Sequence, residues 1–95
     1  MMPLLYETQG DTAHAQIDGE LTIYTAADLA AQLLPCLGNT RRMELDLSQV
    51  TEMDGAGLQL LLIALREAPK AGTQLALTAR SKTVSETLEL CNLPA

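Results

Sequence analysis

A strand, a loop, an aliphatic helix and another strand in the second half of the chain constrain its fold more than any other feature. Arg42–Leu47 alternates polar and apolar residues, which is the periodicity of a half-buried β-strand. A mostly aliphatic stretch over residues 55–68 predicts a helix, which Pro69 should stop because proline lacks the N–H that a helix interior needs. Leu75 and Leu77 mark the next strand. This succession implies a right-handed parallel crossover, so the chain is expected to form an α/β layer.

The first quarter of the chain predicts three strands in a meander. Leu4–Thr8 is the first, and apolar residues alternate with polar ones over residues 13–17, which predicts the second. Asp18-Gly19 separates this stretch from Leu21 and Ile23. Because an Asp-Gly pair between alternating stretches is typical of a two-residue hairpin, we expect the second and third strands to pair through it.

Two further helices have recognisable starts. Thr25 can cap a helix that should end or kink near Leu34, since Pro35 follows. Ser81 can cap a last helix, whose apolar residues at i, i+4 and i+7 are Val84, Leu88 and Cys91. The predicted order is β-β-β-α-β-α-β-α, with the helices packed against one mixed sheet.

The central helix is apolar around much of its circumference. One stripe at helical spacing should face the core, and it consists of Leu58, Leu61, Leu62, Leu65 and Ala68. Leu60, Ile63 and Ala64 extend the apolar surface beyond that stripe, whereas an ordinary surface helix has a polar opposite face. Either the helix is sandwiched at the centre of the domain, or a partner covers part of it.

Size and charge exclude several classes of function. The chain has 95 residues, which predicts one domain over residues 1–95. Its formal net charge of -6 does not fit a nucleic-acid-binding protein, and it is a poor match for an anionic membrane surface. The longest aliphatic stretch, Leu60–Leu65, is too short to span a bilayer, and the N-terminus lacks the features of a signal peptide. We expect a cytoplasmic protein without direct membrane insertion.

The sequence offers no group of residues typical of a metal site, a cofactor site or a catalytic site. Cys36 and Cys91 show no CxxC spacing and are interpreted as two small buried hydrophobes. His14 is the single histidine and should face solvent, on the side of its strand opposite the neighbouring alanines. A triad can be assembled on paper from Ser48, His14 and Asp54, but the GxSxG turn that exposes a serine nucleophile is absent. We therefore expect no enzyme, no cofactor and no metal.

The loop that opens the central helix reads Asp54-Gly55-Ala56-Gly57. Asp54 occupies a natural N-cap position, and the first N–H groups after it have no partner within the helix. Such a helix end can bind an anion. Glu52 and Asp54 would repel phosphate, however, and no Lys or Arg follows before Arg66. The GxGxxG and GxxxxGK[ST] motifs are absent as well. A plain strand-to-helix turn is the simplest interpretation of these residues alone.

Residues 44–62, ELDLSQVTEMDGAGLQLLL, resemble the central signature of STAS domains, the family of anti-sigma-factor antagonists. In that signature an apolar strand ends in Asp-[Leu/Phe]-Ser, and Asp-Ser-Ser-Gly-Leu opens a helix after a short link. The residues that match it position by position are Asp46, Leu47, Ser48, Asp54, Gly57 and Leu58. Residues 19–29 are similar to the hairpin and first helix of the family, and residues 71–93 to its last strand and helix. The resemblance implies a STAS-like α/β domain, a small mixed β-sheet with three helices packed mainly on one face.

The resemblance also implies a non-enzymatic module that binds other proteins. In sigma-regulating members, an anti-sigma kinase phosphorylates the second hydroxyl residue of Asp-Ser-Ser-Gly, and the added charge breaks the interface. Ala56 stands at this phosphoacceptor-equivalent position and cannot accept phosphate, and Gly55 replaces the other hydroxyl. Ser48 is interpreted as a hydroxyl that caps the backbone rather than as an acceptor. The expected partner-binding residues are Ser48, Thr51, Asp54, Gly55, Ala56, Gly57 and Gln59.

The resemblance leaves the identity of the partner open. One expectation is signal transduction and transcription regulation, with an anti-sigma kinase or a chemotaxis or two-component protein as partner. The alternative is an accessory STAS subunit of a lipid-transporting ABC system that maintains outer-membrane asymmetry, in which the partner is the transporter ATPase. The C-terminal LCNLPA is loosely similar to that group. A dimerising α/β domain with no switch is the third reading, so a homodimer also stays open.

Overall fold

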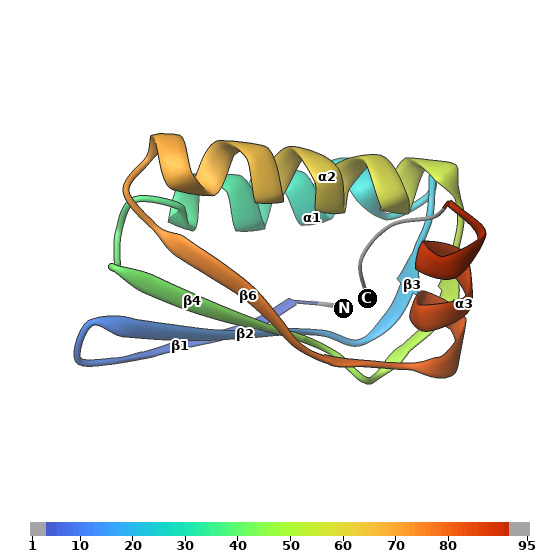
Figure 1. The fold of residues 1–95 in the computed structure, drawn as a ribbon, viewed down its shortest axis with the longest axis horizontal. Coiled ribbons are helices and arrows are strands. Elements are labelled where there is room, and N and C mark those ends of the chain that lie inside the picture. The colour runs from blue at the N-terminus through green and yellow to red at the C-terminus, as the bar shows by residue number, and fades with distance from the viewer. Residues whose placement is uncertain (1–3, 92–95) are drawn as a thin grey trace.

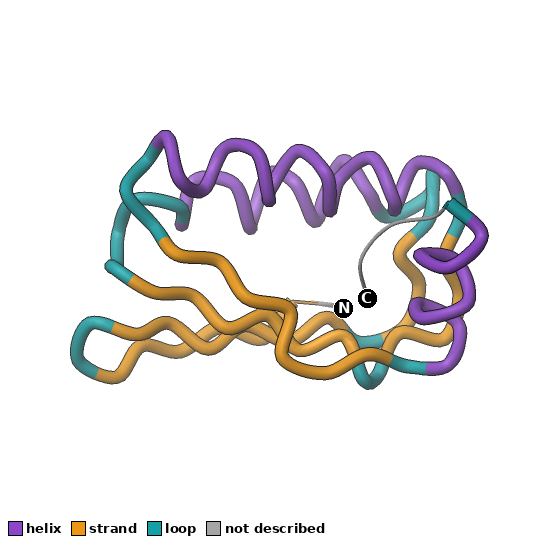
Figure 2. The backbone as a smooth tube through the Cα atoms, in the orientation of Figure 1, coloured by secondary structure: helices purple, strands orange, loops and turns teal. Residues whose placement is uncertain are grey.

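The computed structural model describes residues 4–91 of the chain, shown in Figures 1 and 2. The last four residues of the LCNLPA sequence lie outside this range. In chain order, the elements are β1 (Leu4–Gln9), β2 (Thr12–Ile17), β3 (Gly19–Leu21), α1 (Ala26–Leu33), the 3-10 helix η1 (Leu34–Cys36), β4 (Arg42–Leu47), β5 (Val50–Met53), α2 (Gly55–Lys70), β6 (Gln74–Arg80) and α3 (Lys82–Leu90).

The main sheet is mixed and has four strands in the order β1-β2-β4-β6. β1 and β2 pair antiparallel, whereas β4 pairs parallel with both β2 and β6. α1 and α2 contact each other over one face of this sheet, and α3 lies at one end of it (Figure 1). The predicted α/β fold, with a parallel crossover from β4 through α2 to β6, is confirmed.

The predicted hairpin at Asp18-Gly19 is wrong. β3 does not pair with β2 but pairs parallel with β5, in a separate two-stranded sheet that the sequence did not predict. The hairpin of this region joins β1 to β2 through a two-residue turn at Gly10-Asp11, where Gly10 has a φ of 62°. Because β1 and β4 occupy both edges of β2, the chain has to leave the main sheet after β2 ends.

The core lies between the main sheet and helices α1 and α2. The inward-facing side chains of β2 and β4 are buried, as their alternation predicts: Ala13, Ala15, Ile17, Met43, Leu45 and Leu47. α1 contributes Leu29 and Leu33, and α3 contributes Val84 and Leu88. Since burying one such aliphatic side chain stabilises a fold by about 1.5–3 kcal/mol, these contacts carry most of the stability that positions the loops.

The predicted core stripe of α2 is confirmed at Leu61 and Ala68, but the buried face is rotated away from the other leucines of that stripe. Its buried residues are Gly57, Leu60, Leu61, Ala64 and Ala68, whereas Leu62 and Leu65 stay 37% and 39% exposed. Small residues at most of these positions bring the helix close to the sheet, so the face with fewer leucines is the one that packs. α2 also continues to Lys70, with Pro69 inside its last turn rather than after its end.

Helices α1 and α3 begin at the predicted N-cap residues, but only one of these two residues makes the capping hydrogen bond. Thr25 is the N-cap of α1, yet its hydroxyl makes no capping bond and instead accepts the Thr22 N–H at 3.0 Å. Ser81 does cap α3, since its Oγ accepts the Val84 N–H at 3.2 Å. α1 ends before Pro35, as predicted.

Candidate functional site

Asp54 ties the first turn of α2 to the loop that follows β3. Its Oδ1 accepts the N–H groups of Ala56 at 2.9 Å and Gly57 at 3.1 Å, so it caps α2 as predicted. Its Oδ2 accepts the N–H of Ile23 at 2.9 Å, from a residue 31 positions earlier in the chain. One carboxylate therefore fixes two loops with respect to each other.

These hydrogen bonds lower the pKa of the Asp54 carboxyl. The bond from the Ile23 N–H is the largest cause, followed by the bond from Gly57, and the bond from Ala56 acts in the same direction. Each bond is stronger to the ionised form, which is why the proton is held less tightly. The positive end of α2 also favours a negative charge at this position. Asp54 is therefore ionised throughout the neutral pH range.

Gly57 lets α2 begin directly against β3. A Cβ at this residue would overlap the Leu21 carbonyl oxygen and would lie 2.8 Å from the Leu21 carbonyl carbon. Gly55 differs, because no heavy atom lies within 4 Å of the position of its Cβ. The two glycines of the loop thus have separate causes: Gly57 is required by internal packing, and Gly55 leaves the surface open.

The predicted partner-binding residues do not form one cluster. Asp54, Gly55 and Ala56 lie together at the start of α2, and Gln59 is exposed on the next turn. Gly57 is buried beneath them, so its contribution is to the shape of this surface. Ser48 and Thr51 lie farther back along the chain, before and within β5, which ends at Met53, directly before Asp54. An extended strand rises about 3.3 Å per residue, which puts Thr51 roughly 10 Å from Asp54.

The prediction that the Ser48 hydroxyl caps the backbone is wrong. Its N–H donates to Asp46 Oδ1 at 2.8 Å, and its Oγ accepts from Gln49 Nε2 at 3.4 Å. Hydrogen bonds from the side chain and the backbone of Ser48 hold the pKa of the Asp46 carboxyl below its usual value. The capping group of this turn is therefore Asp46, and Ser48 is its hydrogen-bond donor.

Two exposed apolar side chains beside Asp54 were missed by the sequence reasoning. Ile23 is 69% exposed and Tyr24 is 87% exposed, in the loop between β3 and α1. The sequence pattern predicts a strand that includes Ile23, whereas β3 ends at Leu21. The available signal was an apolar pair directly before the N-cap residue Thr25, where the helix has not yet begun. Both residues belong to the loop that Asp54 holds through the Ile23 N–H.

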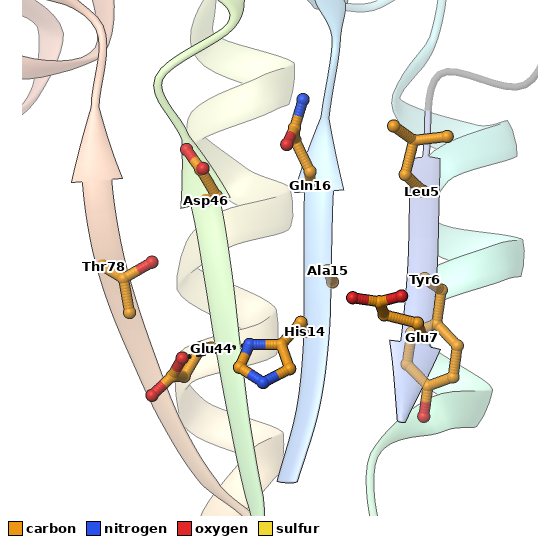
Figure 3. A pocket seen from close by; sticks show the side chains of 9 residues that line it. All are labelled: Leu5, Tyr6, Glu7, His14, Ala15, Gln16, Glu44, Asp46 and Thr78. Carbon is orange, nitrogen blue, oxygen red and sulfur yellow. Dashed lines mark ion pairs between the residues drawn. The ribbon is translucent and has the colours of Figure 1, made fainter. Parts of the chain in front are cut away.

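His14 faces outward from the side of the main sheet that α1 and α2 leave uncovered, as predicted (Figure 3). Its Nδ1 lies 3.1 Å from Glu44 Oε1, and Glu44 Oε2 lies 3.5 Å from Arg42 Nε. The hollow around it is also lined by Asp46 and Thr78. Over residues 4–91, no group of three or more His, Cys, Asp or Glu side chains is placed to hold a metal ion.

The cysteines and the helices add two observations. Cys91 is exposed and Cys36 is half-buried, so the prediction of two buried cysteines is wrong for Cys91. None of the helices in the described part of the chain has the length and apolar character needed to cross a membrane.

Comparison with known proteins identifies a family and a fold. A family model described as "Mlab, STAS domain" matches residues 4–94. An anti-sigma factor antagonist from Mycobacterium paratuberculosis superposes with a TM-score of 0.78 at 20% identity, covering 94% of this chain and 76% of that one. The anti-sigma factor antagonist SpoIIAA in its unphosphorylated form gives 0.77 at 19% identity, covering 95% and 81%.

The structure of Mglu is similar over a smaller part of its length. Its TM-score is 0.72 at 19% identity, covering 82% of this chain, which spans only 20% of Mglu. At such identities these likenesses show the fold alone, and the family rests on the model that matches nearly the whole sequence. The chain belongs to the STAS domain family.

Proposed function

We propose that this chain is a non-enzymatic regulatory module that binds another protein through the start of α2 and the loop after β3. The observation that carries the proposal is the set of three backbone N–H groups that Asp54 accepts from both loops. A surface held in one conformation before binding loses less entropy when a partner docks. The family supports the coarser statement, since anti-sigma-factor antagonists with this fold are regulatory proteins.

The chemistry of this surface suits a protein partner. Gly55 and Ala56 carry little or no side chain, so a partner backbone can approach the helix start closely. Ile23 and Tyr24 add exposed apolar area next to them. Tyrosine is enriched among the side chains that dominate binding energy at interfaces, because it buries a large area at low entropic cost. We therefore assign Tyr24 as an anchor residue of this surface.

The surface has no switch at the usual position. Ala56 has no hydroxyl, and its N–H is already engaged by Asp54 Oδ1. Docking is then either permanently available or controlled by another part of the system. Incubation with a cognate kinase should leave no phosphate on residues 48–57. Phosphate on Ser48 or Thr51, detected by mass spectrometry, would overturn this part of the proposal.

Two kinds of partner are proposed for the surface. The first is an anti-sigma kinase, or a chemotaxis or two-component protein, in line with the anti-sigma-factor antagonists that share the fold. The second is the ATPase of a lipid-transporting ABC system, with the chain as its accessory subunit. The family model that matches is the Mlab model, and this match, with the missing phosphoacceptor, favours the second candidate.

Partner capture from the native cell tests the proposal. The tagged full chain should retain either a kinase-type signalling protein or a transporter ATPase, identified by mass spectrometry. Ala56→Asp places a charge in the surface and should weaken the retained interaction about tenfold or more. Ala31→Asp, the same change at an exposed position of α1, is the matched control and should bind normally. Equal binding by both variants and the parent chain would move the docking surface elsewhere.

A further inference from the structure

α2 carries a second apolar stripe, of which Leu58 packs against the core whereas Leu62, Leu65 and Pro69 are exposed. Its residues follow the spacing i, i+4, i+7 and i+11, and they are Leu58, Leu62, Leu65 and Pro69. The opposite flank of the helix, with Glu67 and Lys70, lines a hollow together with Leu34 and Leu37 beside α1. The second stripe therefore faces the other side, toward β6, where Leu62, Leu65 and Pro69 stay exposed within the part of the chain that the structure describes.

β6 is an edge strand with free backbone groups. It pairs with β4 alone, and the Gln74 N–H donates to the Arg41 carbonyl oxygen at 2.8 Å. Since successive residues of a strand point their backbone groups in opposite directions, the N–H and C=O groups of Leu75 and Leu77 point to the free edge. The strand contains no Pro or Lys that would discourage pairing. Its register with β4 shifts after Leu77, and pairing resumes at Ala79 and Arg80.

The start of the free edge and the C-terminal half of the second stripe line one groove, in which Leu65 and Pro69 of α2 lie beside Gln74 and Leu75 of β6. Leu75 and Leu77 lie opposite Met43 and Leu45 in the sheet, so they point to the helix side. Met43 and Leu45 are fully buried, whereas Leu75 and Leu77 are only half-buried, because no strand among residues 4–91 pairs with the far edge of β6. Leu65 and Pro69 line this groove together with Leu75, and α2 lies above β6 in the view of Figure 1. An edge strand beside an apolar helix flank is the arrangement that binds extended peptides by strand addition.

The charge of the groove selects its occupant. All six Lys and Arg residues of the chain lie between positions 41 and 82, and the first forty residues contain none. Arg41 lines the groove at the start of β6 and makes no ion pair within residues 4–91. A cation at the end of an apolar groove favours a carboxylate on the bound segment.

We propose that the groove between α2 and β6 binds an extended segment of a partner protein as an added strand. The segment carries apolar side chains at alternate positions, which enter the groove, and an acidic residue that meets Arg41. An antiparallel pairing with a second copy is disfavoured, because it would bring the Arg41 end of each β6 against the Arg80 end of the other. This surface is separate from the one around Asp54, so the inference does not rest on the proposed function.

The test uses the full chain, with a displayed library of random dodecapeptides as the probe. Selection should enrich peptides with alternating apolar residues and an acidic residue near one end. Leu65→Asp should weaken binding of the selected peptides at least tenfold, because it places a carboxylate where the apolar side chains of the peptide dock and repels the acidic residue of the peptide. Leu90→Asp is the matched control, since this leucine of α3 is 88% exposed and lies outside the groove, and it should bind normally. Circular dichroism checks that both variants fold.

Two readouts locate the bound peptide. In amide NMR spectra, the signals of Leu75 and Leu77 should shift on binding, and the hydrogen exchange of these amides should slow. In methyl NMR spectra, the signals of Leu62 and Leu65 should shift as well. Arg41→Glu should weaken the acidic peptides and should favour the same peptides with lysine in place of the acid. A purely apolar contact would leave this preference unchanged.

Three results would overturn the proposal. The first is a selection without enrichment, and the second is equal binding of the selected peptides to the parent chain and to Leu65→Asp. The third is a dimer in sedimentation that Leu65→Asp dissociates, because it would assign the edge to a second copy. A loss of partner capture in Ala56→Asp concerns the other surface, so the failure of either proposal leaves the other standing.

Discussion

Replacing Gly57 with alanine tests whether α2 is set against β3 as closely as the structure shows. In the interior of a helix, glycine-to-alanine ordinarily stabilises by about 1 kcal/mol, because glycine loses more backbone entropy on folding. At Gly57 the new Cβ would overlap the backbone carbonyl of Leu21, which no side-chain rotation can relieve. Overpacking of this kind costs about 1–3 kcal/mol, and a backbone obstacle belongs at the upper end. We expect Gly57→Ala to be destabilised by about 1–2 kcal/mol.

Gly55→Ala is the matched control. It lies in the same turn and adds the same methyl group, but nothing lies within 4 Å of its Cβ position. The difference in stability between the two variants isolates the cost of the overlap, about 2–3 kcal/mol. For a domain of this size, that corresponds to a melting temperature about 8–24 °C lower for Gly57→Ala than for Gly55→Ala. Thermal and urea denaturation followed by circular dichroism measure it. A Gly57→Ala variant that melts at or above Gly55→Ala would refute the reasoning.

Three further predictions concern single hydrogen-bonding side chains. Thr73→Val should lower the free energy of unfolding, measured by urea denaturation, by about 1–3 kcal/mol. The buried Thr73 hydroxyl accepts the Gly38 N–H at 2.7 Å and donates to the Thr40 carbonyl at 2.8 Å, and valine can do neither. An unchanged free energy of unfolding would contradict this role of the hydroxyl. Ser81→Ala should cost about 1 kcal/mol by the same measurement, through the lost cap of α3, and an unchanged midpoint would count against that bond. Asp54 has a lowered pKa in the folded state, so its contribution to stability is present above about pH 4 and is lost as pH falls through the lowered value. The stability gap between the parent chain and Asp54→Asn should therefore be constant at neutral pH and close in acid, and a gap that widens in acid would contradict the assignment.

Local patterns predicted the parts of the fold that depend on neighbouring residues. The alternation in β2 and β4 and the caps at Asp54 and Ser81 are all visible within a few positions of sequence. The pairing of β3 with β5 is not, because it joins strands about thirty residues apart, and β5 exposes Thr51 and Glu52. A turn signal such as Asp18-Gly19 states that the chain bends there, but not which strand it meets next.

Side-chain size explains why the buried face of α2 was misplaced. A pattern based on hydrophobicity ranks leucine above alanine and glycine, so it aligns the core with the leucines. Packing depends also on the distance between the helix and the sheet. The small residues Gly57, Ala64 and Ala68 allow α2 to lie close to the sheet. For the site, the cap at Asp54 was predictable, whereas its bond to Ile23 depended on the tertiary fold. The exposed pair Ile23 and Tyr24 became visible only once β3 was seen to end at Leu21.

The uneven distribution of charge along the chain has a kinetic consequence. The molecule is acidic overall, whereas Arg41, which makes no ion pair within residues 4–91, places a positive charge at one end of the groove between α2 and β6. An approaching charged partner would turn it before contact, so that encounters begin with one face already forward. The association rate constant of such a complex should fall as ionic strength rises, while the dissociation rate constant changes little.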